Sequence, residues 1–390
     1  MIHQSPINQK GNNIEPLKPT RNEPRRLCET IKLRDPHQTY INIMSNIAML
    51  YHGHNEELHP AHRGFAEAIN ADIRSISNTS PHNVKSFYQE IARGYSIGKY
   101  DTVIAEGSRP LYTGLIHKMI YGSNLVYLCA DHRLYNLWNR SVPVTSAYSF
   151  FKHILGTYGK PVVRTIAQRG VDGIIAVSDF VKEYLRPIFG DTVPIRVAHP
   201  YIQPDLYDSL GSVEPNLNEK IAVTIGRATR YKGVDLLVDA WPAVRERHPG
   251  AELHVVGKGH PESFEDTDGV TVHGFVEDIA DVYTNAGLYV QPSRIDPFPV
   301  TVLEALRAGV PTVVTESTGS RSEIKEIDER LIASTSANGL GEVVNWYMGL
   351  PQVEKEELSS DSKIRGEKFG PQFQKKAFSQ EFQRLMSEIE

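Results

Sequence analysis

Two cations stand close together on one short segment in the second half of the chain. Arg227 and Lys232 follow the apolar run KIAVTIG, with Gly226 and Gly233 beside them. A guanidinium and an ammonium group at this spacing suit a pyrophosphate, because preorganised cations stabilise the charge that such a group gains when it leaves. The segment therefore predicts a phosphate site. The alternative is a pair of surface cations that flank a helix.

Two carboxylates follow in the segment LYVQPSRIDPFPVTVLEALRAGVPTVV, residues 288–314. Asp296 stands in the loop after an apolar strand candidate, and Glu304 stands about one turn into a predicted helix. We expect both side chains at one site, where carboxylates accept hydrogen bonds from sugar or ribose hydroxyls. For Glu304 the alternative is an exposed helix acid.

The same segment predicts where that helix begins. Pro297 and Pro299 hold the residues before them in extended conformations, and proline suits the first position of a helix. A helix that opens at Pro299 leaves the N–H groups of Val300 and Thr301 facing the carboxyl end of the strand. Helix N-termini attract phosphate groups, and ligands of open parallel sheets bind at this edge.

Short apolar runs that alternate with helical stretches must position these residues. The first half contains TYINIMSNIAML, ADIRSIS, DTVIAE, NLVYLCA, GIIAVS and PIRVAH, and the second half contains KIAVTIG, AELHVVG, VTVHGF, LYVQPS and TVVTES. Strands of this length, apolar on both faces and separated by helices, are typical of parallel sheets with helices on each side. The pattern predicts an α/β protein with two Rossmann-like domains.

The length of 390 residues is too great for one ordinary core and favours two domains. Residues 1–37 are polar and rich in proline and asparagine, so we expect a flexible tail. The best linker is QPDLYDSLGSVEPNLNE, residues 203–219. We therefore expect a first domain over 38–205, a second domain over 206–374, and a C-terminal helix over 375–390 that crosses back to the first domain.

Composition narrows the function classes. A formal net charge of -5 argues against a nucleic-acid binder. Two cysteines cannot form a disulfide framework, which suits a reducing compartment. No apolar run reaches the ~18 residues that span a bilayer, and the first residues lack the apolar stretch of a signal peptide. We expect a cytoplasmic protein, with peripheral contact to the cytoplasmic membrane face left open.

Four quoted segments together resemble the retaining glycosyltransferases of family 4, which have the GT-B fold of two Rossmann-like domains facing a cleft. VTIGRATRYKG is similar to the Gly-Arg and Lys-Gly element of that family, and HGFV to its base-binding turn. DPFPVTVLEALRAGVPTVV is similar to its motif of two acids separated by seven residues, and VDGIIAVSDFVKEYL to its last first-domain strand and helix. The resemblance is specific over residues 210–325 and weak before residue 165.

The resemblance implies a role for each matching residue. It places Arg227 and Lys232 on the donor diphosphate, Glu304 on the ribose hydroxyls and Asp296 on the donor sugar. It places the nucleobase on the turn Gly274, Phe275 and Val276, and it counts Gly226, beside Arg227, among the donor-binding residues. The implied reaction moves a sugar from a nucleotide-diphosphate donor to an acceptor hydroxyl, with no protein-bound metal and no cofactor besides the donor.

The chain departs from the family pattern at the donor loop. Asp296 stands where the family usually has Glu, and Pro299 stands where a Gly is expected. The family's double Gly appears as Gly319-Ser320, and its N-terminal Gly-rich loop has no clear counterpart. The donor base, the sugar, the acceptor and the oligomeric state are left open by the sequence.

The acceptor side offers fewer signals. Asp131 and His132 follow the run NLVYLC, where a group of the first domain can meet donor and acceptor; a cap at the strand end is the alternative. Residues 132–170 contain no acid, and their cations are interleaved with aromatic residues. This composition suits an anionic membrane surface and a lipid-linked saccharide acceptor. The alternative is an amphipathic helix with solvated cations.

Other chemistries have weaker support. His52, His54, His59 and His62 lack the spacing of a known metal-ligand set, and Gly257-Lys258-Gly259 is only a fragment of a dinucleotide fingerprint. A nucleotide-sugar epimerase of the same fold and a non-catalytic partner subunit remain the alternatives to a glycosyltransferase.

Overall fold

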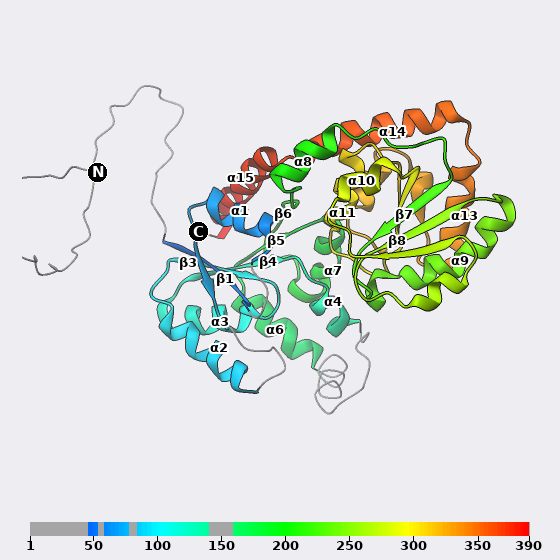
Figure 1. The fold of residues 1–390 in the computed structure, drawn as a ribbon. Coiled ribbons are helices and arrows are strands. Elements are labelled where there is room, and N and C mark those ends of the chain that lie inside the picture. The colour runs from blue at the N-terminus through cyan, green and yellow to red at the C-terminus, as the bar shows by residue number, and fades with distance from the viewer. Residues whose placement is uncertain (1–45, 54–57, 78–83, 140–158, 390) are drawn as a thin grey trace, which may run out of the picture. The chain divides into compact units, whose positions relative to one another are not determined.

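The computed structural model describes residues 46–53, 58–77, 84–139 and 159–389 (Figure 1). The predicted tail 1–37 lies outside these residues. The described strands form two parallel six-stranded sheets, which we call the first and the second sheet. Both belong to one compact unit, Ser45–Glu390, and both confirm the predicted α/β class.

The first sheet has the order β2-β1-β3-β4-β5-β6. Its four inner strands are buried along almost their whole length, as in a parallel sheet that helices cover on each side, while the edge strand at the start of this order is partly exposed. The strands are β1 (Ile47–Tyr51), β2 (Asp72–Ser75), β3 (Thr102–Glu106), β4 (Asn124–Cys129), β5 (Gly173–Ala176) and β6 (Ile195–Val197). The helices are α1 (Pro60–Ala68), α2 (Val84–Ser96), α3 (Pro110–Tyr121), α4 (Arg133–Trp138), α6 (Lys160–Gly170) and α7 (Asp179–Phe189).

The second sheet has the order β12-β11-β10-β7-β8-β9. Its strands are β7 (Ile221–Ile225), β8 (Glu252–Val256), β9 (Val270–Gly274), β10 (Leu288–Gln291), β11 (Thr312–Thr315) and β12 (Ile332–Ala333). Its α-helices are α9 (Val234–Arg247), α10 (Ile279–Thr284), α11 (Val300–Arg307), α12 (Arg321–Lys325), α13 (Ala337–Met348) and α14 (Gln352–Gly366). Short 3-10 turns complete it: η1 (Arg230–Lys232), η2 (Glu262–Asp266), η3 (Glu329–Leu331) and η4 (Glu367–Phe369).

Each predicted strand run contains a strand, but two elements differ from the sequence interpretation. The second sheet ends in β12, whose two residues are too short to give an apolar run. The predicted linker 203–219 contains a helix, α8 (Pro204–Gly211), which the sequence interpretation did not include. Pro204 at the first helical turn is compatible with a helix, and Leu210 gives that helix a buried anchor.

The last helix, α15 (Pro371–Ile389), packs on the first sheet although it follows the second in the chain. The ring of Phe378 stacks on Phe65 of α1 at a centroid distance of 4.2 Å. The side chain of Leu385 fills the space above Gly173 of β5, where an added Cβ would lie 2.9 Å from a Leu385 methyl. The domain limits at 205/206 and 374/375 stay predictions.

Candidate functional site

The predicted donor residues lie where the strand order of the second sheet reverses. β7 and β10 are neighbours, with Tyr289 paired to Val223, and the chain winds away from them in opposite directions. Ligands of open parallel sheets bind at the edge where the strand order reverses in this way. The loop after β7 carries Lys232, and the loop after β10 carries Asp296.

Backbone contacts join these two loops. The N–H of Arg294 donates to the carbonyl of Tyr231 over 2.8 Å. Gly233 has a φ of +68°, and an added Cβ there would lie 2.0 Å from the carbonyl oxygen of Pro292. Only glycine allows this approach, because the left-handed conformation and the short distance both exclude a side chain.

A two-pronged ion pair reinforces the contact. Both Nη atoms of Arg294 reach the carboxylate of Asp235 in the first turn of α9, over 2.6 and 2.7 Å. The hydrogen bond from Arg294 holds the pKa of Asp235 below its usual value. The two loops are therefore tied to each other and to α9.

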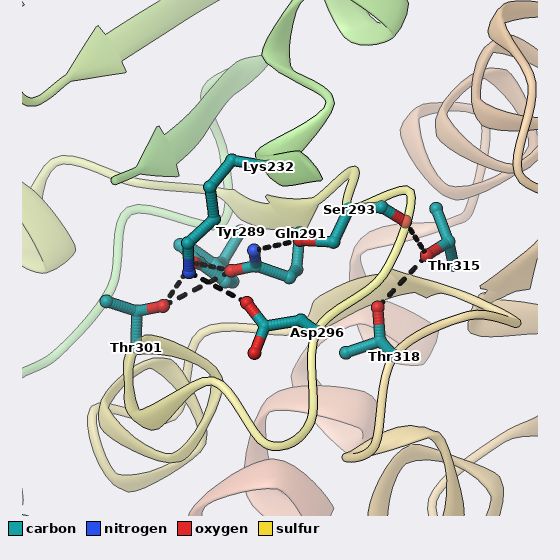
Figure 2. A network of polar contacts seen from close by, with 8 residues as sticks. All are labelled: Lys232, Tyr289, Gln291, Ser293, Asp296, Thr301, Thr315 and Thr318. Carbon is teal, nitrogen blue, oxygen red and sulfur yellow. Dashed lines mark hydrogen bonds and ion pairs between the residues drawn. The ribbon is translucent and has the colours of Figure 1, made fainter. Parts of the chain in front are cut away.

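Lys232 and Asp296 form an ion pair across the loops (Figure 2). The Lys232 Nζ lies 2.7 Å from Asp296 Oδ2, and the side chains are 20% and 9% exposed. The Asp296 backbone is fixed on both sides, since its N–H donates to Ser317 and its carbonyl accepts from Gly319. The structure thus brings together a cation and an acid that lie 64 residues apart in the chain.

A buried polar network that sequence reasoning missed lies behind this pair (Figure 2). The Tyr289 hydroxyl lies 2.6 Å from Gln291 Oε1 and 2.8 Å from Thr301 Oγ1. The Gln291 amide donates to Ser293 Oγ, and the Thr315 hydroxyl donates to the Ser293 carbonyl. A glutamine at the end of an otherwise apolar strand was the available signal, because a buried amide needs polar partners.

Helix α11 begins beside the pair. Its first residue is Val300, with Pro299 as the N-cap at φ −70° and ψ 121°, so the helix opens one residue after the predicted position. The Val302 N–H donates to the Pro299 carbonyl. The N–H groups of Val300 and Thr301 have no hydrogen-bond partner among the described residues, so this end of α11 presents two backbone donors.

Glu304 lies deeper along the same helix. The Tyr283 hydroxyl donates to its carboxylate over 3.3 Å and reaches the Thr301 carbonyl over 3.0 Å. Burial raises the pKa of Glu304 to about 7, and the Tyr283 hydrogen bond only partly opposes this. Burial also raises the pKa of Tyr289, and the negative charges of Glu304 and Asp296 raise it further.

The remaining donor-side predictions lie at the ends of β7 and β9. The Gly226 N–H donates to Val256, and the Arg227 side chain is exposed, with no ion pair among the described residues. Gly274 has a φ of +65° and accepts from Gly257 over 2.6 Å.

Phe275 projects from the turn at the end of β9. Its ring is 63% exposed, with Lys258 Nζ 4.4 Å from the ring centroid, and Val276 is half-buried beside it. An exposed aromatic ring at this position can stack on a planar base.

The acceptor-side residues have unequal surroundings. Asp131 accepts backbone N–H groups at both carboxylate oxygens, from Ser108 and Arg133, each over 2.8 Å. This geometry matches the cap alternative. The His132 ring lies 4.8 Å from the ring of Tyr231, next to Lys232. Burial lowers the pKa of His132, while the negative charges of Asp131 and, to a smaller extent, Asp296 raise it. His132 therefore faces the ion-paired loops, and a catalytic role for either residue stays a prediction.

The acid-free stretch 132–170 is described only at its ends, because residues 140–158 lie outside the described part. Lys160 of α6 lies over the Trp138 ring, 4.7 Å from its centroid. Val162 and Ile166 on the same helix are 58% and 54% exposed. In the described ranges no helix has both the length and the apolar character to cross a bilayer, and no group of three metal-binding side chains occurs there.

Comparison with known proteins gives these features a context. Residues 219–348, from just before β7 to the end of α13, match the family described as "Glycosyl transferases group 1". The mannosylfructose-phosphate synthase of Agrobacterium fabrum is 36% identical over 25% of this chain and 25% of its own length. The chain thus spans about a quarter of the length of this curated relative.

Solved structures match nearly the whole chain. The sucrose-phosphate synthase of Thermosynechococcus elongatus superposes with a TM-score of 0.65 at 16% identity, over 88% of this chain and 99% of its own. The Anabaena protein Alr3699/HepE, solved with UDP and glucose, gives 0.64 at 16% identity over the same shares. The predicted GT-B fold is therefore confirmed, and residues 219–348 form a glycosyltransferase domain of the group 1 type.

Proposed function

We propose that the chain is a retaining glycosyltransferase of family 4 that moves a sugar from a nucleoside-diphosphate donor to an acceptor hydroxyl. The observation that carries this proposal is the Lys232–Asp296 pair at the strand-order reversal, beside the free N–H groups of α11. The group 1 match over 219–348 and the UDP bound by the Anabaena structural relative support it.

The donor diphosphate is held by positive groups from two loops. Lys232, Arg227 and the N-terminus of α11 supply charge and backbone donors. The Glu304 carboxylate accepts hydrogen bonds from the ribose hydroxyls, and the Asp296 carboxylate accepts them from hydroxyls of the transferred sugar. The turn Gly274, Phe275 and Val276 takes the base. The proposed site needs no metal, because its cations already oppose the charge of the pyrophosphate.

The reaction breaks the bond between the anomeric carbon and the pyrophosphate oxygen. The acceptor oxygen forms the new bond on the same face, and its proton passes to the leaving phosphate oxygen. Lys232 and Arg227 stabilise the charge that this phosphate gains. His132 faces the reacting centre from the first sheet and positions the acceptor; the Asp131 carboxylate holds the loop that carries His132.

Charge removal tests the donor site. The chain is incubated with a panel of nucleotide sugars, and released nucleotide and epimerised donor are measured separately. We expect nucleotide release with at least one donor, and a loss of about 100-fold or more in kcat/KM for Arg227→Gln with Lys232→Met, a loss typical of removing transition-state charge stabilisation. Epimerised donor would favour the nucleotide-sugar epimerase, and donor binding without turnover would favour the non-catalytic partner subunit. Full turnover by the double variant would refute the proposed site.

We further propose that the acceptor is a lipid-linked saccharide, reached by peripheral contact of the first domain with the cytoplasmic membrane face. The absence of acids over 132–170 and the exposed Val162 and Ile166 of α6 support this contact. Vesicle sedimentation tests it.

A further inference from the structure

Lys232 has one ammonium group, and the proposed reaction asks it to meet two anions. It contacts Asp296 directly, yet the donor pyrophosphate needs the same cation. We propose that Lys232 exchanges Asp296 for the pyrophosphate when the donor binds, and that this exchange makes the site favour an intact nucleotide sugar over the nucleoside diphosphate product. The inference rests on the proposed function and deepens it.

The surroundings restrict this exchange to the two side chains. The loop of Lys232 is fixed by Gly233 against Pro292, and the backbone of Asp296 is bonded to Ser317 and Gly319. Neither loop can move away without breaking these contacts. The Lys232 side chain has a flexible four-carbon stem and three N–H donors, so it can turn to a new anion while its backbone stays in place.

A nucleoside diphosphate alone meets resistance. When Lys232 turns to its phosphates, the Asp296 carboxylate, only 9% exposed, loses its sole charged partner among the described residues. A buried carboxylate without a cation or hydrogen-bond donor is costly. The terminal phosphate of a nucleoside diphosphate also carries the additional charge of a monoester, which Asp296 repels.

An intact nucleotide sugar removes both difficulties. Its pyrophosphate is a diester with no terminal monoester charge, and its sugar brings hydroxyl donors to the loop of Asp296. The carboxylate then exchanges an ammonium for hydroxyl groups and stays satisfied. After transfer the sugar leaves the donor, Asp296 regains Lys232, and the competition promotes release of the nucleoside diphosphate.

The exchange predicts an unusual gain of affinity. Isothermal titration of the full chain uses UDP, GDP and their sugar-bearing forms, and the pair that binds is carried forward. We expect Asp296→Asn to bind the nucleoside diphosphate about tenfold tighter than wild type, because one partly buried negative charge no longer competes with the phosphates. The affinity of this variant for the nucleotide sugar should be no higher than that of wild type. Asp296→Glu keeps the charge and is expected to keep the preference.

A matched control and a double-variant cycle separate exchange from general repulsion. Asp268→Asn removes the same charge at a side chain that is 82% exposed and paired with Arg245, so both affinities should stay unchanged. In Lys232→Met the effect of Asp296→Asn should shrink to less than half, because the competition requires the ammonium. Ligand-observed NMR measures the weak nucleotide affinities of the variants that carry Lys232→Met.

The outcomes distinguish the two proposals. If Asp296→Asn leaves nucleoside diphosphate affinity unchanged, or tightens it equally in Lys232→Met, the exchange is wrong while the donor site stands. If the wild-type chain binds no nucleotide of either kind, the proposed function fails and the exchange fails with it. Circular dichroism confirms that each variant is folded.

Discussion

At the scale of single residues, Glu304 shows how burial adjusts an acid to a ligand. Its carboxyl group projects from α11 and accepts a hydrogen bond from the Tyr283 hydroxyl, and burial raises the pKa of this carboxyl group to about 7. A site that must accept ribose hydroxyls benefits from the ionised form, which is a pure acceptor. Near neutral pH the carboxyl group is therefore close to half protonated before the donor binds.

This predicts a pH dependence of donor affinity. A pKa raised from 4.5 to about 7 means that the folded chain must lose a proton before the ribose binds. Nucleotide-sugar affinity should rise with pH and fall about tenfold from pH 8 to pH 6, as the ionised fraction falls. Titration calorimetry of wild type and Glu304→Gln measures it, and the variant should bind weakly with a flat profile.

The choice of ligand and a stability measurement make this test specific. A nucleotide sugar is used because its pyrophosphate diester does not titrate in this range. The free chain should also lose unfolding free energy as pH rises through the window from about 4.5 to 7, because the folded state holds the proton more tightly. Equal slopes in wild type and Glu304→Gln would assign the pH dependence to another group.

Residue type and loop position were the signals for the site residues, whose roles stay predictions. Lys232 and Asp296 lie 2.7 Å apart because both follow neighbouring strands of the same sheet. Their direct pairing was not predicted, since it depends on the distance between two loops. Tyr289 and Thr315 were missed because in sequence they are typical strand residues, and only the fold turns them toward the site.

At the scale of elements, one glycine determines how closely the two loops of the site approach. Gly233 ends η1 in the left-handed region and lies against Pro292. We expect Gly233→Ala to lower the unfolding free energy by more than the ~1 to 2 kcal/mol of a left-handed alanine, because the added Cβ also pushes the loops apart. The affinity for the nucleotide sugar should fall as well. Urea unfolding measures the free energy of unfolding, and titration calorimetry measures the affinity.

Gly250 provides the matched control. It has a φ of +90°, yet no atom lies within 4 Å of its added Cβ. Gly250→Ala should therefore show only the conformational cost, with full donor affinity. Equal losses in both variants would mean that the loop contact contributes nothing beyond backbone strain.

Element prediction depended on how many residues carry a signal. Runs of apolar residues identified the strands of both sheets, while the two residues of β12 gave none. Proline placed the start of α11 within one residue, but the polar composition of 203–219 hid α8. Composition alone cannot distinguish a linker from a short surface helix whose single buried anchor is Leu210.

At the scale of the whole molecule, the alternation of strands and helices was enough to predict two parallel sheets. A return of the C-terminal helix to the first domain was expected, but the residue pairs that join segments far apart were beyond the sequence, because no local pattern encodes them. Ser178 of the first sheet's last loops donates to the carbonyl of Pro297, 119 residues away, over 2.7 Å. Phe378 of α15 stacks on Phe65. The Ser178 hydrogen bond connects the two sheets through the loop that carries Asp296, and the stacked rings fix α15 on the first sheet.

The outer face of α6 gives the last prediction at this scale. Val162 and Ile166 are one helical turn apart and both more than half exposed, near the cations Lys160 and Arg169. Cations near anionic headgroups contribute about 1 kcal/mol each, and the apolar pair adds buried area. The full chain should sediment with vesicles that contain anionic lipid, and high salt should release it.

A second pair of the same residue types decides whether the effect belongs to this face. Val353 and Ile364 of α14 are 64% and 58% exposed, but they lie on a helix with several acids. Val162→Ser with Ile166→Ser should weaken sedimentation several-fold, while Val353→Ser with Ile364→Ser should leave it unchanged. Because both variants replace one exposed valine and one exposed isoleucine, equal effects would indicate nonspecific adsorption through any exposed apolar residue. Binding that ignores salt and lipid charge would exclude the docking face on α6.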